Sequence, residues 1–176
     1  GRLVIAGGAW SNDALGMLGH RLPLEVTQEQ VTYFDSPRLE AFRPGAFPTW
    51  IWMDEPCFYG FPVFGEPAVK IAQDAGGEVV TASTRTFDPD VANLARVTAL
   101  GERVMPSALG PIRYTKTCLY TLTPDRDFVI DAVPGAPGVH VAIGAGHAFK
   151  FASVIGRVLS ELALDGTTPT DLEPFR

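Results

Sequence analysis

The strongest constraint on the fold is a glycine turn that separates an apolar run from an amphipathic run near the C-terminus. Residues 139–143 are apolar and predict a buried strand, whereas residues 150–164 repeat apolar side chains at helical spacing. Gly144 and Gly146 lie between the two runs and allow a positive φ or a close approach to a bulky group. The helix start behind this turn offers unpaired N–H groups, which suit an anion. We therefore expect a strand, a glycine turn and a helix that form a ligand-binding corner.

A second copy of this pattern opens the chain. A strand over residues 2–6 is followed by Gly7 and Gly8, and then by a helix over residues 12–18 with Ser11 as its N-cap. Neither copy contains the full G-x-G-x-x-G fingerprint of a dinucleotide site, so each turn taken alone is more often structural than a cofactor contact. If the protein binds a dinucleotide, the pyrophosphate loop is expected upstream of these residues.

The middle of the chain is rich in short β-prone runs. Asp88 and Pro89 predict the start of its one long helix, with Asp88 as N-cap and Pro89 in the first helical position. The expected strands cover residues 22–33, which form either a strand pair or one bent strand, and residues 50–53, 57–59, 68–72, 112–123 and 128–130.

These elements predict an α+β fold with two domains. The antiparallel middle, residues 22–110, is expected to form one domain. Residues 1–21 and 111–176 carry the two strand–glycine turn–helix units, so we expect the chain to leave an α/β layer and re-enter it. There is no initiator Met, and the chain opens directly into a strand. We therefore expect it to be the C-terminal part of a longer protein.

Composition and charge exclude several classes of function. The chain is 46% hydrophobic and 19% charged, as in ordinary globular proteins, and its net charge of −6 includes no basic cluster, which argues against nucleic-acid binding. No apolar run approaches the length of a membrane span, and no signal peptide is visible, so we expect a cytoplasmic protein. Its two cysteines and three scattered histidines lack the spacing of a metal site, and no metal is expected.

Four polar side chains are candidates for chemistry. Lys70 is flanked by apolar residues on a predicted strand, where spacing alone favours a solvent-facing side chain; a partly buried lysine would instead be a fixed cation able to stabilise developing negative charge. Cys118 is most simply a small buried side chain, unless cations nearby favour its thiolate. His147 and Lys150 are three residues apart at the glycine turn, and form either a surface pair or an anion site.

Taken in order, several fragments of the chain resemble the C-terminal half of the monomeric sarcosine oxidase and N-methyltryptophan oxidase family, which belongs to the D-amino-acid oxidase-like flavoproteins. The resemblance covers nearly the whole chain. The fragments are Ala6-Gly7-Gly8-Ala9-Trp10, Tyr59-Gly60-Phe61-Pro62, Val69-Lys70-Ile71, Cys118-Leu119-Tyr120-Thr121, Phe128-Val129-Ile130-Asp131 and Gly146-His147-Ala148-Phe149-Lys150-Phe151.

The resemblance implies an FAD-dependent oxidase of a small secondary amine, with oxygen as the second substrate and hydrogen peroxide as a product. It assigns residues 22–110 to a substrate-binding domain and the flanking segments to an FAD-binding domain. It also implies roles for single residues. The catalytic residues would be Lys70, as the cation that activates oxygen, and His147. The substrate-binding residues would be Trp50, Tyr59, Tyr120 and Lys150. The FAD-binding residues would be Gly7, Gly8, Gly144, Gly146 and Cys118, the last through a covalent thioether link.

The chain departs from the family pattern at a few positions, which bear on the substrate more than on the chemistry. Asp74 lies where the sarcosine oxidases usually have a histidine, and Ala148 replaces a glycine. A related dehydrogenase, or an oxidase of fructosyl amino acids or pipecolate, is therefore an alternative. A binding module without catalysis is an alternative from another class. In each case the half-length chain is expected to be inactive alone.

Overall fold

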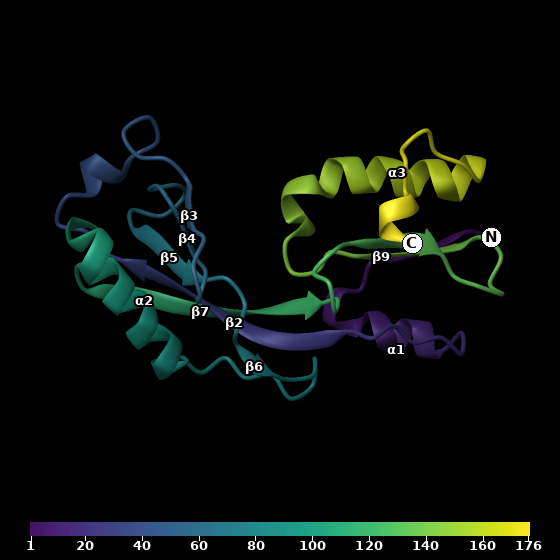
Figure 1. Ribbon diagram of the computed structural model, residues 1–176, viewed down its shortest axis with the longest axis horizontal. Coiled ribbons are helices and arrows are strands. Elements are labelled where there is room, and N and C mark those ends of the chain that lie inside the picture. The colour runs from purple at the N-terminus through teal and green to yellow at the C-terminus, as the bar shows by residue number, and fades with distance from the viewer. The chain divides into compact units, whose positions relative to one another are not determined.

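The computed structural model describes all residues from Gly1 to Arg176 (Figure 1). Its strands are β1 (Leu3–Ile5), β2 (Glu25–Phe34), β3 (Trp50–Trp52), β4 (Phe58–Phe61), β5 (Val69–Gln73), β6 (Glu78–Val79), β7 (Ile112–Leu122), β8 (Val129–Ala132) and β9 (Val139–Ile143). Its α-helices are α1 (Ser11–Gly16), α2 (Val91–Val104) and α3 (Ala152–Asp165). Short 3₁₀ turns are η1 (Gly8–Trp10), η2 (Leu39–Phe42), η3 (Pro106–Ala108), η4 (Ala148–Phe151) and η5 (Glu173–Phe175).

The chain is an α+β protein with two compact units, which confirms the predicted fold class. The first unit contains Gly1–Thr27, Val79–Ser83 and Leu119–Arg176, and the second contains Gln28–Glu78 and Thr84–Cys118. The unit boundaries thus differ from the predicted domain boundaries of 1–21, 22–110 and 111–176. The long strands β2 and β7 each begin in one unit and end in the other.

The first unit is built on a three-stranded sheet with the order β1-β9-β8. Strand β1 is parallel to β9, and β8 is antiparallel to it. Helix α1 covers one face of this sheet through the buried Leu15, which packs against Ile5 and Val141. Helix α3 covers the opposite face through Val158 and Leu162, and Figure 1 shows the two helices on the two sides. Both strands that precede a glycine turn are therefore neighbours in one covered layer.

Both predicted helices of the first unit begin differently than expected. Ser11 is the first residue of α1 rather than its N-cap, and its buried hydroxyl makes no capping bond. The physical reason is η1, in which the N–H of Ser11 already donates to the carbonyl of Gly8. At the other end of the chain, η4 holds Lys150, and α3 starts only at Ala152. The left-handed Gly166, with φ of 78°, then ends α3.

The second unit holds most of a six-stranded sheet with the order β3-β4-β5-β2-β6, in which β7 also pairs with β2. Strand β2 is continuous, which decides between the two predicted alternatives for this segment. One face of the sheet packs on α2 through a core that includes Phe34, Val69 and Ile71 on strands and Val97 and Leu100 on the helix. This core fixes β5, the strand that carries Lys70.

Helix α2 starts later than predicted, because its N-cap is Asp90 rather than Asp88. The Asp90 carboxylate accepts a hydrogen bond from the N–H of Asn93 at 2.9 Å. The buried Gln30 side chain binds both backbone groups of Asp90, accepting from its N–H at 2.8 Å and donating to its carbonyl at 3.1 Å. This anchoring from β2 keeps Asp90 extended, so that the helix begins at Val91.

Candidate active-site elements

The predicted site residues are distributed over both units. The second unit contains Trp50, Tyr59, Lys70 and Cys118, and the first contains Gly7, Gly8, Tyr120, Gly144, Gly146, His147 and Lys150. Within each unit, the structure brings several of them together.

Lys70 is half-buried on β5 and does not face open solvent. Its Cα pairs with Phe61 on β4 and with Tyr33 on β2. The ammonium nitrogen lies 4.8 Å from the centroid of the Phe61 ring and 5.6 Å from that of Tyr59. Burial lowers the pKa of Lys70, and the negative charge of Cys118 in its thiolate form opposes this effect. Lys70 is therefore the partly buried cation that would suit a site where negative charge develops.

Cys118 is a free, half-buried thiol on β7, the strand that pairs with β2. Burial raises its pKa, and the carboxylate of Glu29 raises it further. Lys70 and Arg85 act in the opposite direction, since both cations favour the thiolate. The net effect of burial and charge is a raised pKa, so Cys118 remains a protonated thiol and is not a strongly activated nucleophile.

Glu29 is a feature of this region that the sequence did not single out. It is a carboxylate only 2% exposed, and it accepts hydrogen bonds from the N–H of Gly77 at 3.2 and 3.3 Å. A side chain at Gly77 would place its Cβ 2.0 Å from the carbonyl oxygen of Gln28, so this approach requires glycine. The only available signal was an acidic residue at an inward position of an alternating strand.

Trp50 packs flat against the neighbouring strand at Gly60, its pairing partner in β4. A Cβ built on Gly60 would lie 2.5 Å from Cε2 of the indole ring, so the ring occupies the space of the missing side chain. The indole N–H is enclosed and has no acceptor. The glycine of the Tyr-Gly-Phe-Pro fragment is therefore explained by packing, and the role of Trp50 in a substrate pocket stays a prediction.

The two glycine turns of the first unit follow the carboxyl ends of neighbouring strands, β1 and β9. Gly8 has φ of 53° and no atom near the place of a side chain, which leaves its outer side open. Gly146 has φ of 81°, and a Cβ there would lie 2.5 Å from the ring of Tyr120. A Cβ at Gly144 would lie 2.4 Å from that of Ala148. In open α/β sheets, the crevice outside such strand ends is where ligands bind.

His147 and Lys150 contact each other beside the second of these turns. Nε2 of His147 lies 3.0 Å from the carbonyl oxygen of Arg126, and its ring packs on Phe128 at 4.8 Å between centroids. The Lys150 ammonium donates to the carbonyl oxygen of His147 at 2.7 Å and lies 3.5 Å from Nδ1 of the same residue. These contacts hold an exposed cation and an oriented imidazole next to the glycine turn.

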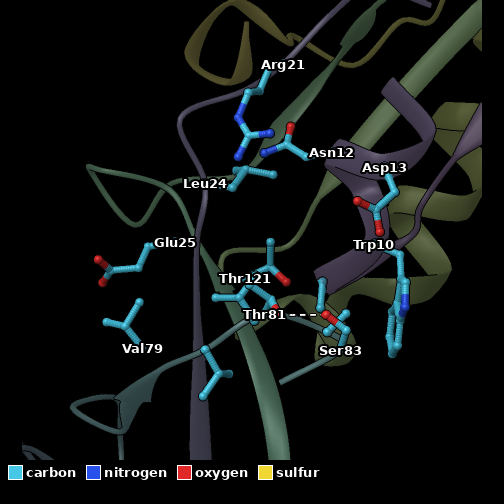
Figure 2. Close-up of a pocket in the computed structure, with 14 residues that line it drawn as sticks. Trp10, Asn12, Asp13, Arg21, Leu24, Glu25, Val79, Thr81, Ser83 and Thr121 are labelled. Carbon is cyan, nitrogen blue, oxygen red and sulfur yellow. Dashed lines mark hydrogen bonds between the residues drawn. The ribbon is translucent and has the colours of Figure 1, made fainter. Parts of the chain in front are cut away.

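A cavity of the first unit lies between elements that carry none of the predicted site side chains into it (Figure 2). It has a volume of about 530 Å³ and lies between α1, the start of β2 and residues 79–83. Asn12 shapes it by binding the backbone of Leu22 through two hydrogen bonds of 3.0 and 2.9 Å. Across the cavity, the hydroxyls of Thr81 and Ser83 lie 3.0 Å apart. None of the predicted site residues lines it.

Two further findings concern possible sites and location. No group of three or more His, Cys, Asp or Glu side chains is arranged to hold a metal ion. None of the helices has the length and apolar character needed to cross a membrane.

The fold and these residues define a class of protein. It is an α+β chain with glycine turns at the ends of parallel strands, and its antiparallel sheet carries a half-buried lysine near a cysteine. Comparison of the sequence with known families identifies the family within this class. Residues 1–162 match the model of the FAD dependent oxidoreductase family, and the chain belongs to that family.

Proteins similar to this chain include a sarcosine oxidase and an N-methyl-L-tryptophan oxidase. The chain is 33% identical to monomeric sarcosine oxidase from Bacillus sp. (strain NS-129) over 99% of its own length and 46% of that protein. It is 29% identical to N-methyl-L-tryptophan oxidase from Escherichia coli O1:K1 / APEC, over 99% of the chain and 46% of that protein. Among solved structures, NikD, an unusual amino acid oxidase essential for nikkomycin biosynthesis, superimposes with a TM-score of 0.79 at 26% identity, over 99% of this chain and 47% of its own. The chain thus spans about half the length of these relatives.

Proposed function

We propose that the protein, at the length of its relatives, is an FAD-dependent oxidase of a small secondary amine of the sarcosine or N-methyl amino acid type. The products would be an imine, which hydrolyses to an aldehyde and an amine, and hydrogen peroxide. The observation that carries this proposal is the 33% identity to monomeric sarcosine oxidase over 99% of the chain. The half-buried cation at Lys70, held beside Cys118, supports it from the geometry.

The residues of this chain fit FAD as the cofactor. The open side of Gly8, at the end of β1, lets a planar or phosphate-bearing group approach the backbone. At Gly144 and Gly146 the place of a side chain is taken by Ala148 and Tyr120, so the assignment of these two glycines rests on the family resemblance. We assign Gly7, Gly8, Gly144 and Gly146 to this contact. FAD held there would supply a hydride acceptor for the amine and an electron donor for oxygen.

Cys118 is assigned to covalent attachment of the cofactor. Burial and the carboxylate of Glu29 raise its pKa, and Lys70 and Arg85 only partly offset this, so loss of either cation would disfavour the thiolate further. We therefore expect attachment to depend on Lys70 and Arg85 as well as on the thiol itself.

Lys70 is assigned to the activation of oxygen. The first electron that reaches oxygen creates negative charge, and a fixed ammonium nearby stabilises that charge without reorganising. The aromatic rings of Phe61 and Tyr59 hold the Lys70 ammonium at 4.8 and 5.6 Å from their centroids, which restricts its motion. Loss of one such electrostatic contact costs about 10²–10³ in rate.

Lys150 is assigned to the carboxylate of the substrate. Its ammonium is exposed, and the carbonyl of His147 fixes its position beside the glycine turn. That carbonyl takes one of the three ammonium protons and Nδ1 of His147 lies 3.5 Å from the same nitrogen, so one proton remains for an anion. His147 would orient the amine. Its Nε2–H donates to the carbonyl oxygen of Arg126, so Nδ1 carries no proton and is a hydrogen-bond acceptor. Tyr120 of the same unit, and Tyr59 and Trp50 of the second unit, are likewise assigned to substrate binding.

A substrate panel tests this proposal. The full-length protein should release hydrogen peroxide and formaldehyde with sarcosine or another N-methyl amino acid, and much less with glycine. Lys150→Met should raise KM for substrates that carry a carboxylate. The matched control is Arg157→Met, which removes an exposed cation from the same region of the chain, paired only with Glu161 at 3.7 Å, and should leave KM unchanged. Absence of peroxide with every N-methylated amine would contradict the proposal.

A further inference from the structure

The cavity of the first unit drawn in Figure 2 is lined by none of the residues assigned above to FAD or to the amine. Its volume of about 530 Å³ falls within the range of about 300–1,000 Å³ that small-molecule sites occupy. Its walls come from the start of α1, from residues 21–26 and from residues 79–83, together with Thr121 of β7. Because these segments are distant in sequence, the cavity is a feature of the fold and not of one loop.

Hydrogen bonds hold the walls of the cavity in place. Asn12 binds the N–H and the carbonyl of Leu22 at 2.9 and 3.0 Å, which ties α1 to the segment that carries Arg21. At another wall, the N–H of Val80 donates to the carbonyl of Val26 at 2.8 Å, and β6 pairs with β2. The cavity is therefore preformed, which lowers the entropic cost of binding a ligand in it.

Two oppositely charged side chains line the cavity without pairing with each other. Arg21 and Asp13 are both exposed. The one hydrogen bond that Figure 2 draws among the lining residues joins Thr81 to Ser83, and the guanidinium and the carboxylate lie at separate points of the rim. A guanidinium binds a carboxylate through charge-assisted hydrogen bonds, and a carboxylate accepts such bonds from an ammonium group. The cavity thus offers one position for an anion and a separate one for a cation.

Exposed apolar side chains complete the lining. The indole of Trp10, beside Asp13 in Figure 2, is 52% exposed, and Val79, on the other side of the cavity, is 61% exposed. The face of an indole ring attracts an ammonium group, so Trp10 reinforces the position for a cation. Val79 and Leu24 favour an aliphatic group in the rest of the cavity, because covering them removes apolar surface from water.

The lining disfavours other classes of ligand. Arg21 is the only lysine or arginine that lines the cavity, so a polyphosphate would meet one cation and the two carboxylates of Asp13 and Glu25. A purely apolar ligand would take Arg21 and Asp13 out of water without giving them partners, which costs free energy. A zwitterion satisfies both charges at once.

We propose that this cavity binds a free α-amino acid with an aliphatic side chain, with its carboxylate on Arg21 and its ammonium on Asp13 and Trp10. The proposal goes beyond the oxidase function and does not depend on it, because the cavity shares no residue with the proposed oxidase site. Glu25 lines the same cavity, but its carboxylate points away from the other labelled side chains in Figure 2 and is not assigned to the ligand.

Isothermal titration calorimetry of the full-length protein with L-leucine tests this proposal. Leucine should bind, whereas isocaproate, which lacks the ammonium, and isoamylamine, which lacks the carboxylate, should each bind at least about tenfold more weakly. Arg21→Met and Asp13→Asn should each weaken leucine binding about 10- to 100-fold. Both side chains are exposed, so the melting temperature of each variant should equal that of the wild type. The matched control is Glu25→Gln, which removes a charge from the same cavity and should leave the affinity nearly unchanged.

Tryptophan fluorescence provides a second measurement, because Trp10 lies in the cavity. Leucine should change the emission, and the change should be lost in Trp10→Phe and retained in Trp52→Phe, which removes a tryptophan of the second unit. The opposite result for these two variants would place the ligand elsewhere and overturn the proposal.

Two further outcomes would overturn it. One is the absence of leucine binding in both titrations at millimolar concentration. The other is binding that survives both Arg21→Met and Asp13→Asn, since leucine would then occupy another site, such as the proposed amine pocket. Leucine binding that depends on Arg21 and Asp13, in a protein without oxidase activity, would refute only the proposed function.

Discussion

Gly60→Ala should destabilise the second unit through one identifiable contact. The added Cβ would lie 2.5 Å from Cε2 of Trp50, and 2.6 Å from its Cζ2 and Nε1. Non-bonded carbon atoms prefer separations of about 3.5–4.0 Å, so the indole must move by about 1 Å. Trp50 packs against the core of this unit, and forcing such a shift costs about 1–3 kcal/mol. In a chain of this size, that corresponds to a fall in melting temperature of about 2–4 °C per kcal/mol.

A double-mutant cycle measured by urea unfolding tests this reasoning. Trp50→Leu removes the ring atoms that the new Cβ would meet, so Gly60→Ala should cost far less in the Trp50→Leu background than in the wild type. The matched control is Gly156→Ala on α3, where a Cβ meets no atom within 4 Å. This control should be neutral or stabilising by about 0.5–1 kcal/mol. An equal cost of Gly60→Ala in both backgrounds would refute the packing account of Trp50.

Three further predictions follow from burial, charge and capping. Lys70→Met should raise the melting temperature at pH 7, because burial lowers the pKa of Lys70 and so disfavours its charged form in the folded state. In a pH series of thermal melts, the gain should shrink as pH rises from that lowered pKa toward the ordinary lysine pKa of about 10.4, and a gain that persists above it would contradict this cause. The melting temperature should fall as pH rises past the ordinary thiol pKa of about 8.5, because the raised pKa of Cys118 in the folded protein makes the unfolded chain lose the thiol proton first. Thermal melts of Cys118→Ala should show a smaller fall over this pH range, and an equal fall would contradict the raised pKa of Cys118. Asp90→Ala should lower the free energy of unfolding by about 1 kcal/mol in urea titrations, whereas Asp88→Ala should leave it nearly unchanged. The reverse order would indicate that Asp88 is the N-cap of α2, as predicted from the sequence.

Strong local patterns predicted most of the fold. The strand at residues 139–143 and the turn at Gly144 were predictable, because apolar runs and glycines act through the chain's immediate neighbours. The α+β class followed from the order of such elements. The start of α2 was not predictable in this way. Its cap is chosen by Gln30, a residue distant in sequence, whose side chain binds the backbone of Asp90.

In the candidate site, too, some features could be predicted from the sequence and others depend on residues distant in the chain. The identity of Lys70 and Cys118 came from the resemblance to a family, whereas the spacing of Lys70 alone favoured a solvent-facing side chain. The structure shows a half-buried lysine, because the hairpin of β4 and β5 places Phe61 beside it. The influence of Glu29 on Cys118 depends on the pairing of β2 with β7, which sequence periodicity does not determine.

The central proposal is that the full-length protein is an FAD-dependent amine oxidase that attaches its cofactor through Cys118. The most direct test is to denature the full-length protein in acid, separate any free flavin, and record the absorbance and intact mass of the pellet. We predict a yellow pellet heavier by one FAD, with both the colour and the added mass lost in Cys118→Ser and retained in Cys57→Ser. A colourless pellet of unmodified mass, together with a supernatant free of flavin, would contradict the claim.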